Sequence, residues 1–169
     1  MRRLILFRHA KAEAGPSGGE DFERTLTGRG RRDALAMGRV LAEEGFAPDL
    51  ALVSSALRAT QTWDGTSMAF KEVRIEVRDV LYNASPHSIL QEIRRVADGA
   101  QTLMTIGHNP GLQELAVRLL QEGSGSAADV RRLGTQFPPA TAVVFLVDEA
   151  GRCSLEALLL PQRQSADGP

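Results

Sequence analysis

Cysteine is nearly absent from this 169-residue chain, in which Cys153 is the only one. A single cysteine excludes an internal disulfide and fits a reducing compartment. No apolar run approaches the ~20 residues that a membrane-spanning helix needs, and the four apolar residues after Met1-Arg2-Arg3 are too few for a secretory signal. The sequence therefore favours a cytoplasmic enzyme or binding domain that is not held in a membrane.

Excess charge of either sign is also lacking, because the formal net charge is −1. Such a chain has no overall field that would attract nucleic acid or an anionic membrane. Lysine is scarce: Lys11 and Lys71 are the only two among 20 basic residues. Arginine is correspondingly abundant, so that one arginine alone carries little information about function. The length suits one domain over residues 1–161, followed by a polar tail over 162–169.

Six short apolar or alternating segments are typical of strands: residues 4–7, 50–53, 73–77, 102–106, 142–147 and 155–160. The third alternates apolar and charged residues, which indicates a place nearer a sheet edge. The last two are close enough in sequence to form a hairpin. Helical periodicity fills the spaces between the earlier segments. This order predicts an α/β fold, a three-layer α/β/α sandwich with a mostly parallel sheet and one antiparallel strand.

Helix starts are marked by capping residues. Thr27 predicts the start of one helix, and Gly45 its end. Ser54 or Ser55 predicts the cap of the next helix. Ser85-Pro86 and Asn109-Pro110 each place a capping side chain before a proline at the first helical position. Residues 123–126 predict a flexible loop.

Two histidines and two arginines follow the predicted strands at three separate junctions. Arg8-His9 follows the first strand, Arg58 lies in the first turn of the helix after the second, and His108 follows the fourth. Each residue alone is compatible with an ordinary surface role. The carboxyl ends of parallel strands share one edge of a sheet, however, and ligands bind there. Together the four residues predict a pocket for a dianion such as phosphate.

The segments around these residues resemble the three signatures of the histidine phosphatase superfamily, whose fold is also called phosphoglycerate mutase-like. They are Arg8-His9-Ala10, residues 54–62 and residues 107–110. Within that superfamily the chain is most similar to the SixA-type phosphohistidine phosphatases. That finer likeness rests on the short length and on residues 24–30, Leu81-Tyr82 and residues 137–140.

The resemblance implies a mechanism. His9 would attack phosphorus through one ring nitrogen and form a covalent phosphohistidine. Its other nitrogen would donate a proton to a fixed acceptor such as a backbone carbonyl. Arg8, Arg58 and His108 would bind the phosphoryl oxygens. No metal and no cofactor are required. Further contacts with the substrate are expected from four residues nearby: Arg24, Lys11, Ser54 and Asn83.

Two positions depart from the superfamily pattern. Ala10 stands where glycine is usual, a small change. Many relatives also carry a glutamate as proton donor two residues after a leucine, but Leu81 is followed by Tyr82 and Asn83. Asparagine cannot act as a general acid. Asp79 is the nearest substitute, although its position favours a surface carboxylate at a strand end.

The missing acid favours a phosphorylated imidazole as substrate, because imidazole leaves with less assistance than an alkoxide does. The sequence therefore predicts a phosphohistidine phosphatase whose partner is a histidine-phosphorylated signalling protein. Two alternatives stay open: a phosphatase for small phosphate esters, and a phosphate- or phosphoprotein-binding module without turnover. The oligomeric state is left open, with a monomer favoured.

Overall fold

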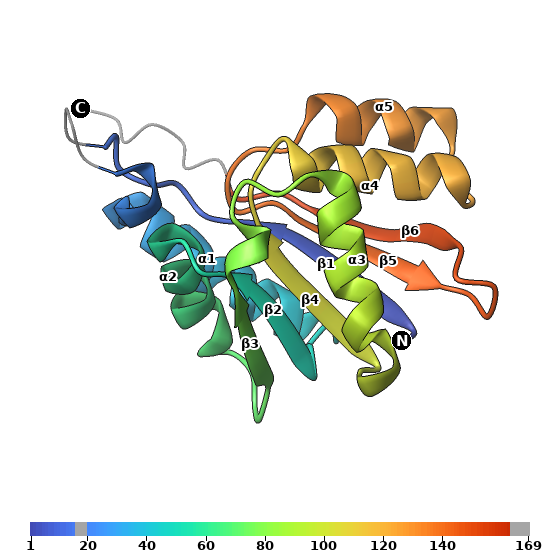
Figure 1. Ribbon diagram of the computed structural model, residues 1–169, viewed down its shortest axis with the longest axis horizontal. Coiled ribbons are helices and arrows are strands. Elements are labelled where there is room, and N and C mark those ends of the chain that lie inside the picture. Colours follow the sequence, from blue (N-terminus) through green and yellow to red (C-terminus); the bar gives the residue numbers. More distant parts are fainter. Residues whose placement is uncertain (16–19, 163–169) are drawn as a thin grey trace.

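The computed structural model describes residues 1–15 and 20–162. Within them six strands form one sheet (Figure 1): β1 (Arg3–Arg8), β2 (Leu50–Ser54), β3 (Arg74–Arg78), β4 (Thr102–Gly107), β5 (Ala142–Val147) and β6 (Cys153–Leu159). All six predicted strands are present, with ends that differ by a few residues. Of the tail predicted for 162–169, all but Gln162 lies outside the described residues, as does part of the polar loop after His9.

The strand order is β3-β2-β4-β1-β5-β6. β1 pairs with β4, and β2 with β3 and β4, in parallel; β5 runs antiparallel to both β1 and β6. β5 is therefore the single reversed strand of the sheet, and the prediction of a mostly parallel sheet with one antiparallel strand is confirmed. β3 lies at one edge, as its alternating sequence predicted.

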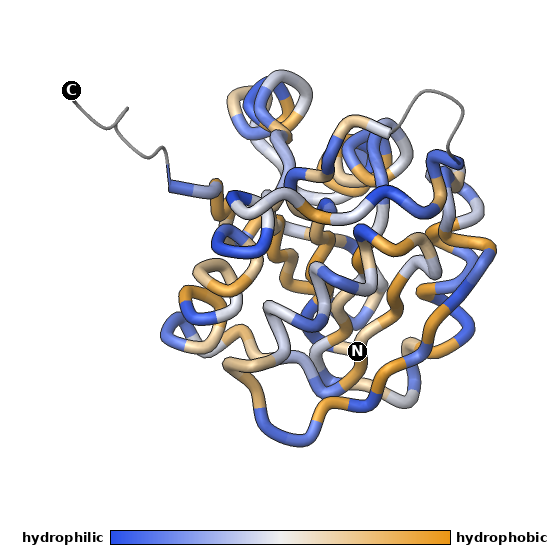
Figure 2. Tube along the Cα trace, turned by 90° about the vertical axis from the view of Figure 1, so that its left-hand side faces the viewer, coloured by the Kyte–Doolittle hydropathy of each residue, from blue (hydrophilic) through white to orange (hydrophobic). Residues whose placement is uncertain are grey.

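Helices cover both faces of the sheet: α1 (Gly28–Glu43), α2 (Leu57–Ser67), α3 (Pro86–Val96), α4 (Gly111–Glu122) and α5 (Ala127–Thr135). Leu4 and Leu6 of β1 pack in one apolar cluster with α3 and α4, whereas Ile5 and Phe7 pack in a second cluster with α1 and α2. This alternation is the period-two pattern of a strand that is buried on both faces. The central strands are accordingly among the most apolar parts of the chain (Figure 2).

Three short 3-10 helices complete the described elements. They are η1 (Asp21–Glu23), η2 (Asp79–Leu81) and η3 (Ala97–Gly99). η1 lies in the polar loop between β1 and α1, and η2 directly follows β3. None of the described helices is long and apolar enough to cross a membrane.

The predicted caps of α1 and α3 are confirmed. The side chains of Thr27 and Ser85 accept hydrogen bonds from Gly30 N–H and Ser88 N–H respectively, and Pro86 is the first residue of α3. Beyond the end of α1, Gly45 adopts a positive φ of 74°, a conformation in which glycine is not strained.

The predicted caps of α2 and α4 are wrong. The N-cap of α2 is Ala56 and that of α4 is Pro110, and neither makes a side-chain cap bond. The predicted capping atoms Ser55 Oγ and Asn109 Oδ1 are buried without a partner among the described residues, and the bonds that Ser54 and Asn109 do make lie elsewhere. The Ser54 hydroxyl is bonded to His108, and the Asn109 amide donates to Gln113 and to the Phe137 carbonyl.

α5 was not expected from the sequence. It packs beside α4, on the outer side of the fold (Figure 1), and Leu133 is its only buried residue. One apolar anchor is too little to produce a recognisable helical stripe. Its start nevertheless carries a local signal, because the Ser126 hydroxyl accepts a hydrogen bond from Asp129 N–H.

Strand register brings the predicted site residues to one edge. Arg8 is paired with Gly107 across β1 and β4, and Ser54 ends β2 beside the last residue of β3. Since β5 is reversed, its amino end reaches the same edge, where Thr141 O accepts from Arg8 N–H. The carboxyl ends of β1, β2, β3 and β4 and the amino end of β5 therefore meet at one edge of the sheet.

Candidate active site

His9 is the first residue after β1, and its imidazole is fixed through one nitrogen. His9 Nδ1 lies 2.8 Å from the carbonyl oxygen of Ala10. Because a carbonyl only accepts, Nδ1 carries the proton and Nε2 keeps its lone pair. The backbone beside it is anchored to α2, since the buried Thr62 hydroxyl accepts from Ala10 N–H at 2.9 Å and donates to Arg58 O at 2.7 Å.

Arg58 lies in the first turn of α2 and is only 3% exposed. Its Nε donates to His9 Nε2 at 3.3 Å. Its two terminal nitrogens donate to Asp21, one to the backbone carbonyl at 2.6 Å and the other to the carboxylate at 2.9 Å. The guanidinium is therefore held on both sides, by the loop that carries η1 and by the histidine.

His108 follows β4, and its ring centroid lies 5.0 Å from that of His9. Its Nε2 is 2.8 Å from the Ser54 hydroxyl, which also accepts a long bond of 3.4 Å from Ala56 N–H. A hydroxyl both donates and accepts, and we assign Ser54 as the donor to His108 Nε2, which places the imidazole proton on Nδ1. His108 Nδ1 is buried and has no hydrogen-bond partner among the described residues.

Arg8 is held at the other side of His9 by the loop that precedes β5. One terminal nitrogen donates to the Phe137 carbonyl at 2.7 Å, whereas the buried Nε has no partner within the described parts of the chain. A buried donor without an acceptor costs about 1–3 kcal/mol. Arg8 Nε and His108 Nδ1 are thus two donors suited to the oxygens of an anion.

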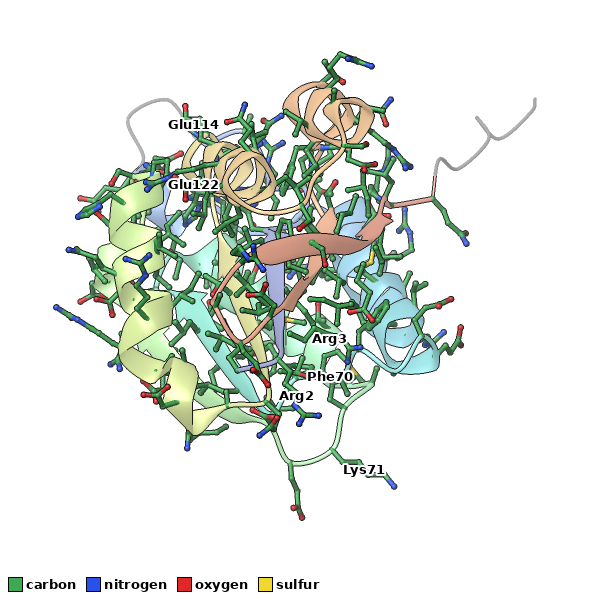
Figure 3. All side chains as sticks on the ribbon, turned by 90° about the vertical axis from the view of Figure 1, so that its right-hand side faces the viewer. Arg2, Arg3, Phe70, Lys71, Glu114 and Glu122 are labelled. Carbon is green, nitrogen blue, oxygen red and sulfur yellow. The ribbon has the colours of Figure 1, made fainter. Side chains whose placement is uncertain are left out.

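These residues line a cleft of about 400 Å³. Its lining includes Arg8, His9, Arg58 and His108, together with the predicted binding residues Lys11, Arg24 and Asn83. The other lysine, Lys71, lies in the turn after α2 and projects away from the body of the protein (Figure 3).

Two residues that the sequence singled out do not line the cleft. Ser54 is fully buried behind His108, so that the expected contact with a substrate is replaced by an indirect one through the imidazole. Asp79 is exposed at the start of η2 and is not among the lining residues. The structure therefore does not bring Asp79 together with the histidines.

Both histidines are neutral near pH 7. Burial, followed by the positive charges of Arg58, Arg8 and Arg24, lowers the pKa of His9 to about 4 despite the opposing hydrogen bond to Ala10. Burial and the neighbouring His9 and Arg58 lower the pKa of His108 to about 3. An imidazole must be neutral to attack an electrophile. His9 Nε2 consequently has the protonation state that a nucleophile requires.

Among the described residues that line the cleft, Asp21 is the only carboxylate. Hydrogen bonds from Arg24 and Tyr82, with further support from Arg58, hold the pKa of Asp21 well below its usual range. The Tyr82 hydroxyl donates to its carboxylate at 2.7 Å, and Arg24 donates at 2.9 Å. The cleft therefore contains a carboxylate that stays ionised and cannot serve as a proton donor near pH 7.

Sequence reasoning missed Asp21, Tyr82 and Thr62 as parts of the site. Thr62 was within a segment already singled out, four residues after Arg58, a spacing that places both on one face of a helix. Asp21 gave no local signal, because its role depends on the return of its loop to α2. Among the described residues no three histidine, cysteine, aspartate or glutamate side chains are grouped as metal ligands would be.

The arrangement is suited to phosphoryl chemistry. A neutral imidazole nitrogen faces a cleft in which two guanidinium groups and an imidazole N–H are available to bind oxygens. Charge that develops on the equatorial oxygens of a transferring phosphoryl group is stabilised by such donors.

Comparison with known proteins agrees with this geometry. Residues 4–85 match the family model of the histidine phosphatase superfamily (branch 1). An uncharacterised protein of Mycobacterium tuberculosis is 36% identical over 140 residues, which cover 83% of this chain and 86% of that protein.

Solved structures share the whole fold. The proposed phosphohistidine phosphatase SixA from Agrobacterium tumefaciens is 30% identical, with a TM-score of 0.84 and coverage of 95% of this chain and 98% of that one. The protein histidine phosphatase SixA complexed with tungstate has a TM-score of 0.76 at 19% identity, with coverage of 93% and 96%. These likenesses confirm the phosphoglycerate mutase-like α/β fold.

Proposed function

The chain belongs to branch 1 of the histidine phosphatase superfamily, and from that premise we propose that it hydrolyses phosphohistidine borne by a protein. The observation that carries the proposal is the state of Asp21. The single carboxylate lining the cleft is held ionised by two arginines and a tyrosine hydroxyl. Asn83 lies nearby in the lining and has no acidic proton.

A cleft without an acid disfavours alkyl phosphate esters, because an alkoxide needs a proton as it leaves. A phosphorylated imidazole can instead take a proton from water on its second ring nitrogen and leave as neutral imidazole. The similarity to SixA structures supports the same substrate class. The tungstate bound in one of them supports the use of this cleft for a tetrahedral oxyanion.

The proposed reaction has two steps. In the first, the lone pair of His9 Nε2 attacks phosphorus, the P–N bond to the substrate imidazole breaks, and a phosphohistidine forms on the enzyme. In the second, water attacks the same phosphorus, inorganic phosphate leaves, and His9 recovers its lone pair. Arg8, Arg58 and His108 bind the phosphoryl oxygens in both steps.

Two measurements test this function. Hydrolysis of a phosphohistidine peptide should exceed that of para-nitrophenyl phosphate in kcat/KM. An aryl ester that is cleaved faster by orders of magnitude would instead indicate an ester phosphatase. Rapid alkaline quench should trap a base-stable, acid-labile phosphoenzyme in the wild type and none in His9→Ala. Tight binding of phosphate without any turnover would establish a binding module in place of an enzyme.

A further inference from the structure

A second cavity, of about 640 Å³, opens beside the catalytic cleft. We call it the side groove. Its lining includes residues from α1, α4, the segment after α5 and the end of the chain's last strand, among them Arg8, Arg29, Asn109, Gln113, Phe137 and Leu160. None of the roles described for the catalytic cleft uses Arg29, Gln113 or Leu160.

The side groove adjoins the catalytic cleft. Arg8 and Asn109 line both cavities. The two side chains also share one acceptor, because Arg8 Nη1 donates to the Phe137 carbonyl at 2.7 Å and Asn109 Nδ2 donates to it at 3.4 Å. A molecule whose phosphoryl group is bound in the cleft therefore has a direct path into the groove across Arg8.

Hydrogen bonds hold the wall of the side groove in place. Asn109 Nδ2 donates to Gln113 Oε1 at 3.0 Å. Gln113 Nε2 in turn donates to the carbonyls of Leu133 and Gly134, at 2.8 and 3.0 Å, near the end of α5. This chain of contacts connects α5 to the residue that follows His108. The groove is thus a formed feature of the site edge, as binding sites usually are.

The lining combines positive charge with apolar surface. Within the described parts of the chain it includes two arginines and no carboxylate, and it includes Leu160, of which 37% is exposed. Arg29 is paired with Asp33 at 3.4 Å on the same helix, where its side chain is 47% exposed. The Asp33 side chain is 13% exposed, but the contact uses only Arg29 Nε, so that both terminal nitrogens of the half-exposed guanidinium stay available. Arg29 is therefore free to pair with an acidic group on a bound molecule.

We propose that the side groove binds the polypeptide that carries the phosphohistidine, with Arg29 pairing with an acidic side chain close to the phosphorylated histidine. The inference rests on the proposed function and adds a specificity to it. Adjacency to the cleft and the charge of the lining argue for a peptide occupant. A free phosphorylated amino acid would fill the cleft and leave the groove empty.

The test compares three substrates: free phosphohistidine, a phosphohistidine peptide with acidic flanking residues, and the same peptide with serine at those positions. Arg29→Gln removes the charge under study. Arg31→Gln is the matched control, because Arg31 is an exposed residue of the same helix and lines neither cavity. Each variant changes the net charge equally, so that non-specific attraction of the peptide changes equally.

We expect wild-type kcat/KM to be highest for the acidic peptide. Arg29→Gln should lower kcat/KM for that peptide by roughly five- to tenfold, mainly through KM, as loss of an interfacial charge pair does. The other two substrates, and Arg31→Gln with all three, should change by less than about twofold. The preference for acidic flanks should also weaken at high salt.

The possible failures are distinguishable. If the wild type hydrolyses all phosphohistidine substrates but Arg29→Gln loses nothing specific to the acidic peptide, the groove proposal is overturned and the proposed function stands. Equal losses with free phosphohistidine would place Arg29 in catalysis or folding, which also overturns it. If the wild type hydrolyses none of the three, the proposed function fails and the groove proposal fails with it.

Discussion

Arg58 Nε donates a hydrogen bond to His9 Nε2 across 3.3 Å, so that a fixed positive charge contacts the atom proposed to bond to phosphorus. The contact keeps this nitrogen free of a proton before substrate binds. Once Nε2 bonds to phosphorus its lone pair is used, and the same N–H is released toward a phosphoryl oxygen. One guanidinium thereby serves the resting histidine and the phosphorylated one in turn.

Asp21 positions that guanidinium, and Asp21→Asn should lower both KM and kcat, each for a different reason. Loss of the carboxylate charge makes the cleft more positive and should lower KM for an anionic substrate. Arg58 at the same time loses its ionic partner and its alignment with His9, which should lower kcat by roughly three- to tenfold. Steady-state kinetics with a phosphohistidine peptide measures both constants, and a variant with both unchanged would contradict the positioning role.

Tyr82→Phe is the companion variant. It removes only the hydroxyl that donates to the Asp21 carboxylate and leaves both arginine contacts in place. Its kcat should remain within about twofold of the wild type, because neutral donors contribute less than charged ones. A loss as large as that of Asp21→Asn would transfer the positioning role to the tyrosine.

The two site histidines should titrate far below the usual range. Histidine ring resonances followed by NMR should give a pKa of about 4 for His9 and about 3 for His108. Variants in which each of the three histidines is replaced by glutamine assign the signals. A midpoint above 6 for His9 would contradict the burial and arginine repulsion described above.

The same shifts have a consequence for stability. Because folding lowers both pKa values from 6.5, the unfolded chain binds more protons than the folded one between about pH 4 and 6.5. The free energy of unfolding should therefore rise with pH across that window. Urea titrations at about pH 5.5 and about pH 7 measure the slope, which should be smaller in His9→Gln.

Ser54→Ala should lower kcat/KM, although the Ser54 side chain does not line the catalytic cleft. The substitution removes the donor that fixes His108 Nε2 and leaves the imidazole free to change tautomer, so that Nδ1 no longer always presents a proton. We expect kcat/KM to fall by about tenfold and inhibition by tungstate to weaken in parallel. Ser55→Ala is the matched control, since the buried Ser55 hydroxyl has no partner in the described chain.

Gly30→Ala should destabilise the fold near the site. A Cβ at this position would lie 2.1 Å from the Lys11 carbonyl oxygen, where α1 meets the loop after His9. Overpacking of this kind costs about 1–3 kcal/mol, which chemical denaturation would detect. Gly134→Ala in α5 meets nothing within 4 Å and should be neutral or slightly stabilising, because alanine is the better helix former.

Much of the fold follows from local sequence. Apolar runs such as 102–106 and caps such as Thr27 act through their neighbours along the chain, and they predicted the corresponding strands and helices. The cap predicted at Ser54 was wrong because the hydroxyl has a distant partner. Ser54 is bonded to His108, 54 residues away, and nothing close to Ser54 in sequence signals that contact.

In the candidate site too, some residues could be predicted from the sequence and others could not. The sequence placed His9, Arg58 and His108 at strand ends, and parallel pairing brings such ends together. Asp21 could not be found, because its ionic role depends on a loop that folds back over 37 residues to reach Arg58. Asp79 was proposed for its nearness in sequence to Asn83, but it lies outside the lining of the cleft.

The first strand of the chain lies in the middle of the sheet, between β4 and β5. β1 is synthesised well before its partners, which begin at Thr102 and Ala142. It therefore remains unpaired, apolar on both faces, until β4 and β5 have been synthesised. The catalytic pocket also forms late, because the contact between Arg8 and Phe137 joins residues that are 129 positions apart. A nascent chain that already displays the nucleophile has no assembled pocket, and activity should begin only after Phe137 and β5 have been synthesised.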